Sequence, residues 1–413
     1  MDALFPRCAG LDVHKANVVA CLRIVGPDGK VTKEVRTFST MTCALRELAD
    51  WLSSQGATHV AMESTGVYWK PVFHILEDRF TVWLVNAQHI KQVPGRKTDV
   101  KDCEWIAQLL QHGLLRPSFI PPRLVRQLRD LTRQRARLVS DKTAVANRIA
   151  KVLEDANIKL GAVATDILGV SGRLMIRAMI AGQEDAGALA GLARGKLKKK
   201  ATALEQALEG AVTEHHRFQL RRLWDQLEAL EGLIEQIDGR VVGLTDQPTR
   251  EAIDRLITIP GVERWTAEVL VAELGTDMGV FPTSGHLASW AGVCPGNNRS
   301  AGKARSGRTT KGDRWLRRAL TQAAWAASHT KETSLSARYR RLAARRGKKR
   351  ALVALGHTIL VIVYHILKRG TIYQELGGNY LDRLEPERTT RQLVKRLEEL
   401  GHKVTLEPGQ DAA

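Results

Sequence analysis

Two aspartates three positions apart, Asp99 and Asp102, are the residues of this sequence best suited to hold a metal ion. If their segment is helical, this spacing places both carboxylates on one face, about 5–6 Å apart at Cβ. Like charges this close repel each other, and a shared divalent cation is the usual reason for such a pair. Two more acids, Asp12 and Glu63, each follow a short apolar run typical of a β-strand. Together the four acids predict a metal-dependent phosphodiester site.

Mg²⁺ is the expected metal, with Mn²⁺ as a substitute, because carboxylate oxygens are the ligands that Mg²⁺ prefers. Two such ions about 3.5–4 Å apart can stabilise the attacking and leaving oxygens of a phosphoryl displacement. A single acid at a strand end is usually inert, so the prediction depends on the four acids together. His14 and His89 are additional ligand candidates, although each residue type is more often structural or at the surface.

Ser300 is a second chemical candidate, because it lies in a polar turn between Arg299 and Lys303. A hydroxyl is a poor nucleophile unless a base or a metal takes its proton, and no histidine is close in the sequence. From spacing alone, a serine that contacts phosphate or shapes a turn is the commoner role. Ser306 is an equal alternative on composition.

The overall charge indicates a polyanionic partner. The chain has 413 residues, with 63 Lys and Arg against 44 Asp and Glu, so its net charge is +19 and its pI is about 10.0. No apolar run approaches the roughly 20 residues of a membrane span, so nucleic acid is expected and a membrane is not. Five scattered cysteines without a C-x-x-C pair, and no apparent secretory signal, favour a reducing cytoplasm, with association to the nucleoid.

Much of this charge lies in one block, in which 17 Lys and Arg between Arg299 and Arg350 face only Asp313 and Glu332. A solvated helix face is the common explanation of a charged run. So dense a block of one sign repels itself unless phosphates neutralise it, which favours binding to nucleic acid. The candidate contacts are Arg299, Lys303, Arg305, Arg308, Lys311, Arg314, Arg317 and Arg318.

The pattern of residues predicts an α/β domain followed by helical regions. Three strands within 9–39, then a helix, a strand at 58–63, a helix, a strand at 81–85 and the helix bearing the acid pair indicate a mixed sheet. The middle region carries two heptad runs, which predict a coiled coil within one chain or between chains, and hence dimerisation. The first run is Leu124, Leu128, Leu131, Leu138, Val145, Ile149 and Val152, in which Arg135 and Lys142 occupy two intervening heptad positions. The second run is Leu220, Leu223, Leu227, Leu230, Ile234, Ile237, Val241 and Leu244.

The C-terminal region is expected to be mainly helical. Leu256–Val262 followed by Trp265–Leu274 is typical of a helix-hairpin-helix, whose turn can present backbone N–H groups to a phosphate; a plain helical hairpin is the alternative. Residues 294–311 are expected to form a loop. The predicted domains are 1–120 for the metal site, 121–249 for the coiled coil, 250–370 for the serine-bearing domain and 371–413 for a tail.

Several motifs together resemble the DEDD transposases of bacterial insertion sequences, a family that includes Piv-type DNA invertases and bridge-RNA-guided recombinases. The resemblance covers residues 8 to about 370 in the family's order, although this chain has a fairly long middle region and a tail after residue 370. The motifs are Gly10–Lys15, Glu63–Gly66, Lys97–Asp102, Ile259–Val262, Ser300–Lys303 and Lys311–Arg317.

This resemblance implies a RuvC-like (RNase H-like) N-terminal domain, a coiled-coil middle and a C-terminal transposase domain. It implies that Asp12, Glu63, Asp99 and Asp102 bind the metal, and that Ser300 forms a covalent phosphoserine bond to DNA. It also implies active centres completed across the protomers of a tetramer. An RNA from the element's non-coding end would pair with donor and target DNA, so that base pairing selects the sequence.

The expected function is therefore that of a Mg²⁺-dependent transposase, a DNA recombinase of an insertion sequence. Its expected partners are donor and target DNA, a bridge RNA and further copies of the chain, from dimer to tetramer. The alternative is a RuvC-like nuclease that uses activated water, has no covalent step and leaves free 3′-hydroxyl ends. A third hypothesis is an architectural DNA-binding protein without catalysis, in which Asp99 and Asp102 have no role.

Overall fold

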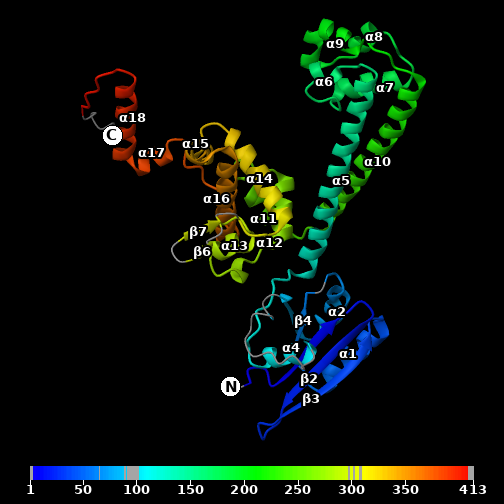
Figure 1. Cartoon of the computed structure of the whole chain (residues 1–413), viewed down its shortest axis with the longest axis vertical. Helices are drawn as coiled ribbons and strands as arrows, with labels where there is room; N and C mark the ends of the chain where they lie inside the picture. Colours follow the sequence, from blue (N-terminus) through cyan, green and yellow to red (C-terminus); the bar gives the residue numbers. More distant parts are fainter. Residues whose placement is uncertain are drawn as a thin grey trace. The chain divides into compact units, whose positions relative to one another are not determined.

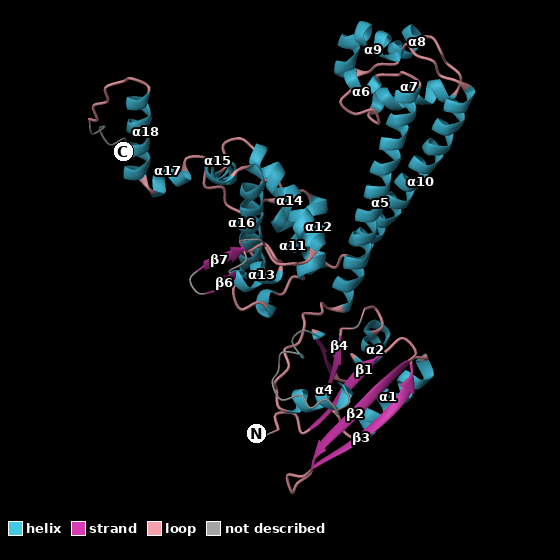
Figure 2. Cartoon of the chain, in the orientation of Figure 1, coloured by secondary structure: helices cyan, strands magenta, loops and turns pink. Residues whose placement is uncertain are grey.

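The chain forms two compact units, Met1–Ile120 and Pro121–Ala413, and each is described by itself (Figure 1). The computed structural model describes residues 3–64, 66–87, 90, 102–295, 298–300, 303–306 and 309–407; for 298–300 and 303–306 only the backbone is considered. The first unit contains a sheet, and the second consists mostly of helices (Figure 2).

The sheet of the first unit has five strands in the order β3-β2-β1-β4-β5. The β1–β2 and β2–β3 pairs are antiparallel, whereas β1–β4 and β4–β5 are parallel, so the predicted mixed sheet is confirmed. The β2–β3 hairpin turns at Gly29, whose φ of 75° suits a residue without a Cβ. The strands are β1 Arg7–Val13, β2 Asn17–Val25, β3 Val31–Ser39, β4 His59–Glu63 and β5 Thr81–Val85.

Helices cover both faces of this sheet, and the alternation of side chains along β1 shows how. Ala9, Leu11 and Val13 belong to a buried cluster with α1 and α2, because every second side chain of a strand lies on the same face. Cys8 belongs to a second cluster, formed with α4 on the opposite face. The helices are α1 Thr42–Ser54, α2 Trp69–Leu76 and α4 Asp102–Gln111.

Two long helices of the second unit, α5 and α10, pack side by side (Figure 1). Arg135 pairs with Asp238 at 2.5 Å and Lys142 with Glu231 at 2.7 Å. The partner numbers fall as the α5 numbers rise, so the helices run antiparallel within one chain. Arg135 and Lys142 interrupt the first heptad run, and a charged residue at such a position helps to set the register of the pair. The coiled-coil assignment and dimerisation stay predictions. The helices span α5 Arg123–Asp155 and α10 Glu214–Leu244.

Short helices join α5 to α10, and a group of helices follows α10. Although this region was expected to be mainly helical, no individual helix was predicted at α15, because its dense arginines hide the short apolar stripe that buries Leu335. The connecting helices are α6 Leu160–Val163, α7 Val170–Ile180, α8 Ala186–Gly191, a 3₁₀ helix Gly195–Lys200 and α9 Ala201–Leu208. The later ones are α11 Gln247–Ile257, α12 Arg264–Leu274, a 3₁₀ helix Met278–Val280, α13 Ser284–Trp290, α14 Arg314–His329, α15 Ser334–Arg346, α16 Lys348–Arg369, α17 Tyr380–Leu384 and α18 Pro386–Glu399.

The helix α16 corrects the expectation that no segment approaches the length of a membrane span. By length and composition alone it is long and apolar enough to cross a membrane, with a mean hydropathy of 1.8 over its most apolar window. Of that window, 44% is buried inside the protein, and α16 packs against α11, α13, α14 and α15. A core helix passes the same length and composition test, and Leu355, Ile359 and Val363 fill that core here.

The predicted helical hairpin is present as α11 and α12, joined by a turn that contains Gly261. A Cβ at Gly261 would lie 2.5 Å from the Ala323 carbonyl oxygen and 2.5 Å from the Ala327 nitrogen, both on α14. With a φ of 84°, the position also suits glycine. Gly261 therefore packs the turn against α14, and the helix-hairpin-helix assignment stays a prediction.

A buried ion network connects α5, α12 and α14. The Glu273 side chain is fully buried and binds Arg133 through two 2.8 Å hydrogen bonds, with Arg129 at 3.1 Å. Arg133 also reaches Asp313 at 2.9 Å, and Asp313 caps α14 by accepting hydrogen bonds from the Trp315 and Leu316 amides. Burial raises the pKa of Glu273, and the Arg133 guanidinium opposes that effect.

We predict that Glu273→Gln lowers the free energy of unfolding of the helical unit by about 3–5 kcal/mol, because it leaves buried guanidinium groups without their carboxylate. Urea titration followed by helical circular dichroism measures this change. The control is Glu251→Gln, which removes the exposed Arg255–Glu251 pair and should cost less than about 1 kcal/mol. Equal losses in the two variants would contradict the role given to Glu273.

Candidate active site

Asp12 and Glu63 lie near the carboxyl-terminal ends of two neighbouring inner strands of the sheet, β1 and β4. Strands β1 and β4 are parallel and pair Leu11 with Met62, so the next residues in register are Asp12 and Glu63. Both side chains lie on the face covered by α4, since side chains alternate along a strand and Cys8 and Ala61 face that helix. Catalytic groups in sheets of this kind lie at the carboxyl ends of strands. The structure thus brings together two of the four predicted acids.

Asp102 begins the helix that crosses this face, and Gly10 allows the helix to come close. A Cβ at Gly10 would lie only 2.3 Å from the Ala107 nitrogen and 2.3 Å from the Cys103 carbonyl oxygen. Backbone therefore contacts backbone, two residues before Asp12 on the same strand. A glycine two positions before the first aspartate was visible in the sequence, but its contact with a segment about ninety positions away was not.

His14 contacts the first of these acids. Its Nε2 lies 3.1 Å from an Asp12 carboxylate oxygen; the His14 side chain is 57% exposed and that of Asp12 26%. The candidate carboxylate is therefore accessible from solvent and has a neighbour that can orient it. Glu104, two residues after Asp102 on α4, has a different partner. Its carboxylate binds Lys33 of β3 at 2.7 Å and raises the pKa of the Lys33 ammonium group.

The complete metal site is not assembled by the described residues. Asp99 and His89 lie outside them, and no group of three or more His, Cys, Asp or Glu within the described ranges is placed to hold a metal ion. Asp12, Glu63 and Asp102 nevertheless supply only carboxylate oxygens, the donor type that suits Mg²⁺. The residues present fit this ion in chemical type.

Ser300 belongs to a hairpin where a loop was expected. It ends the strand β6 Asn298–Ser300, which pairs with β7 Lys303–Ser306, and Ser300 is opposite Lys303. At the base of the hairpin, a Cβ at Gly292 would lie 2.5 Å from the Gly312 nitrogen. The expectation of a loop over 294–311 was therefore wrong for the two strands, whose polar, glycine-rich sequence hides a strand pattern.

Arg317, predicted to contact nucleic acid, also forms hydrogen bonds at the base of this hairpin. It donates hydrogen bonds to the Thr310 carbonyl oxygen at 3.3 Å and to the Thr309 hydroxyl at 3.1 Å. Its guanidinium thus helps to hold the segment that leads from the hairpin into α14. The other candidate contacts divide as follows: Lys311, Arg314 and Arg318 are exposed, Arg299, Lys303 and Arg305 are described by backbone alone, and Arg308 lies outside the described residues.

Acids at one sheet edge, combined with a strongly basic helical unit, are typical of enzymes that act on nucleic acids. Comparison with protein families makes this specific. A family model described as Transposase matches residues 9–158, and that of the transposase IS116/IS110/IS902 family matches residues 253–340. The two matches together cover more than half of the chain. The chain belongs to the IS110 family of DEDD transposases and is a DNA transposase.

Two relatives carry corresponding names. A protein of Pseudomonas aeruginosa named "Probable family 20 transposase" is 28% identical over 325 residues, which are 76% of this chain and 85% of the relative. A Streptomyces coelicolor protein named "Insertion element IS110 uncharacterized 43.6 kDa protein" is 33% identical over 121 residues, which are 29% of each chain. The first similarity extends over most of both chains.

We predict that Gly10→Ala destabilises the protein by about 1–3 kcal/mol, since the added methyl group must push α4 away from β1. Thermal unfolding measures the loss, and the same displacement should reduce DNA strand transfer. Gly26→Ala is the control, because its Cβ would meet the flexible Asp28 side chain at 2.8 Å and backbone only at an ordinary contact distance, 3.6 Å from the Lys30 carbonyl oxygen. A Gly10→Ala protein that melts like the wild type would show that the helix does not contact the strand this closely.

Proposed function

We propose that this transposase cuts and rejoins DNA through a covalent phosphoserine at Ser300, with Mg²⁺ held by a tetrad of Asp12, Glu63, Asp99 and Asp102. The observation that carries the proposal is the register of β1 and β4, which places Asp12 beside Glu63. A mixed sheet with acids at the ends of parallel strands also supports a RuvC-like N-terminal domain.

The carboxylates have a binding role in this proposal. The bound metal would stabilise negative charge on the phosphate as its bonds change. Asp12 and Glu63 are supplied by the sheet, and Asp102 by the helix that packs on Gly10, so the donors come from elements held by backbone contacts. His14 orients Asp12 through their 3.1 Å contact.

Ser300 makes the bond to DNA. Its Oγ forms a bond to phosphorus, the bond from phosphorus to the leaving deoxyribose oxygen breaks, the serine proton passes to a base and the leaving oxygen takes up a proton. The phosphoserine keeps one phosphoester bond for each bond broken, so attack by a second strand's hydroxyl rejoins the DNA and releases the serine. Arg317 and the close approach of Gly292 and Gly312 position the hairpin that carries this residue.

Target choice is proposed to come from a bridge RNA paired with donor and target DNA, in an assembly of two to four copies. The net charge of +19 supports a protein that binds more than one nucleic-acid strand. Exposed arginines on α14 and α15 present this charge, and the contact with a second copy is proposed at the α5–α10 pair, whose heptad runs predicted dimerisation. The helical hairpin of α11 and α12 is a further candidate for phosphate contact. Gly261 itself would not take part, because it packs against α14.

We expect Ser300→Ala to lose the covalent protein–DNA adduct by at least about 10³-fold, because the nucleophile is removed. The measurement is a denaturing gel of wild-type and variant protein with labelled donor DNA. Ser306→Ala is the matched control: it lies on the other strand of the same hairpin and should keep the adduct. Cleavage that survives Ser300→Ala and leaves free 3′-hydroxyl ends would instead establish the RuvC-like nuclease with activated water.

We further expect Asp102→Asn to abolish strand transfer, and chelation by EDTA to do the same until Mg²⁺ or Mn²⁺ is restored. The expected loss for Asp102→Asn is at least about a hundredfold, since one metal ligand is missing. Glu104→Gln lies on the same helix but removes only the partner of Lys33, so its activity should stay near that of the wild type. Full activity of Asp102→Asn would leave the architectural hypothesis in place.

A further inference from the structure

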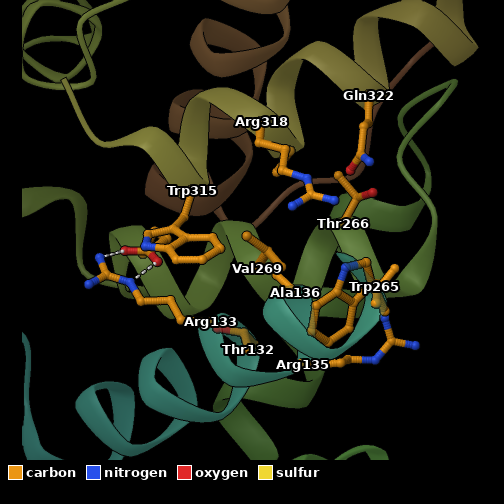
Figure 3. A pocket seen from close by; sticks show the side chains of 13 residues that line it. Thr132, Arg133, Arg135, Ala136, Trp265, Thr266, Val269, Trp315, Arg318 and Gln322 are labelled. Carbon is orange, nitrogen blue, oxygen red and sulfur yellow. Dashed lines mark hydrogen bonds and ion pairs between the residues drawn. The ribbon is translucent and has the colours of Figure 1, made fainter. Parts of the chain in front are cut away.

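A pocket in the second unit lies between α5, α12 and α14 (Figure 3). Two indole rings, Trp265 of α12 and Trp315 of α14, stand on either side of Val269 and Ala136, and the Arg318 side chain lies above Val269 in this view (Figure 3). Trp265 and Trp315 are both partly exposed. The pocket is therefore lined by two indoles and by small apolar side chains, together with the Arg133–Glu273 ion pair and Arg318.

The two indoles are held in place by charged neighbours. The Arg135 guanidinium lies 3.9 Å above the Trp265 ring and is itself bound to Asp238 at 2.5 Å. On the other side, Asp313 accepts the Trp315 amide hydrogen bond at 2.8 Å and is bound to Arg133 at 2.9 Å. These contacts fix the helix positions that set the distance between the walls. A ligand that enters would meet a site that needs little reorganisation.

Guanidinium groups gather where the pocket opens. Arg314 lies 4.5 Å and Arg137 5.8 Å from the Trp315 ring, and Arg318 donates a hydrogen bond to the Ser140 hydroxyl at 3.3 Å. A second hollow continues from the pocket between α5 and α14, and these three arginines line it together with Asp141. Within the described part of the chain, no carboxylate forms an ion pair with Arg137, Arg314 or Arg318. The opening thus carries excess positive charge.

Aromatic side chains next to guanidinium groups that have no carboxylate partner among the described residues match the two halves of a nucleotide. A planar base stacks on an indole, and the adjacent phosphate binds arginine. A paired base in a duplex cannot enter such a pocket, because both of its faces are already stacked on neighbouring bases. A purely apolar ligand would gain nothing from the three cations. The ligand that uses every feature of the site is an unpaired nucleotide within a single strand.

We propose that this pocket holds one unpaired nucleotide of the nucleic acid on which the transposase acts. The base lies against Trp265 and Trp315, and the flanking phosphates lie against Arg137, Arg314 and Arg318. This inference rests on the proposed function in needing nucleic-acid binding, and it adds the place at which a strand is held open. Both DNA and RNA offer this chemistry, and the experiment distinguishes them.

The test measures binding of the full-length protein to short labelled oligonucleotides by fluorescence anisotropy. The probes are single-stranded oligothymidylate, single-stranded oligouridylate, an abasic strand of the same length and a duplex. We expect the wild type to bind a base-bearing strand about tenfold more tightly than the abasic strand. In Trp315→Leu this preference should disappear, while affinity for the duplex stays within about twofold, because phosphate contacts carry duplex binding.

Matched variants separate the pocket from the fold. Trp325→Leu changes a tryptophan of the same helix that is 59% exposed and does not line the pocket, so it should keep the preference for bases. Ala136→Leu fills the pocket without removing either indole and should lose the preference even if Trp315→Leu folds poorly. Trp315→Phe, which keeps an aromatic wall, should retain most of it. A preference seen only with oligouridylate assigns RNA, and one seen only with oligothymidylate assigns DNA.

The outcomes are distinguishable from failure of the proposed function. If the duplex binds but the wild type shows no preference for bases, the pocket assignment is overturned and the transposase mechanism is not. The same holds if Ala136→Leu and Trp315→Leu retain the wild-type preference. If the wild type binds neither strand nor duplex, the nucleic-acid binding on which both proposals depend is overturned with them.

Discussion

The fully buried carboxylate of Glu273 is the interaction on which the second unit depends most. It lies on α12 and binds two arginines of α5, one of which also reaches the capping aspartate of α14. A buried charge tolerates only an arrangement in which its partners are all present, so it specifies how three helices meet. The packing of these three helices sets the position of the segment that leads from the Ser300 hairpin into α14. It also sets the position of the pocket between Trp265 and Trp315.

In the first unit, the corresponding constraint is steric. At Gly10 the backbone of α4 replaces a side chain, and this close approach puts the start of α4 on the sheet face that carries Asp12 and Glu63. Asp12 and Glu63 are neighbours on this face, and like charges so placed repel each other. Close backbone packing in the first unit and a buried ion network in the second thus have the same effect. Each fixes the position of segments that carry candidate site residues.

Most of the N-terminal sheet could be predicted because β1, β2, β4 and β5 are largely apolar runs, while the mostly polar β3 follows the turn at Gly29. The hairpin of Ser300 could not, since Arg299 and Lys303 do not form an alternating apolar pattern and pairing decides the strand. Helix α15 was missed for a related reason: its arginines conceal the few apolar residues that pack inward. The hydrogen bond from Arg317 to the Thr309 hydroxyl could not be predicted either, because a sequence shows the charge of a side chain and not its partner.

The sequence by itself determined which chemical groups are available: four acids, a serine between basic residues, heptad runs and a charge excess that favours a polyanionic partner. These follow from residue type and local spacing, which are properties of short segments. Only the tertiary structure decided that Asp12 and Glu63 are neighbours, that Arg135 and Lys142 find acids on α10, and that Trp265 and Trp315 face one pocket. Contacts between segments that are distant in the chain depend on burial and register, and no local pattern encodes them.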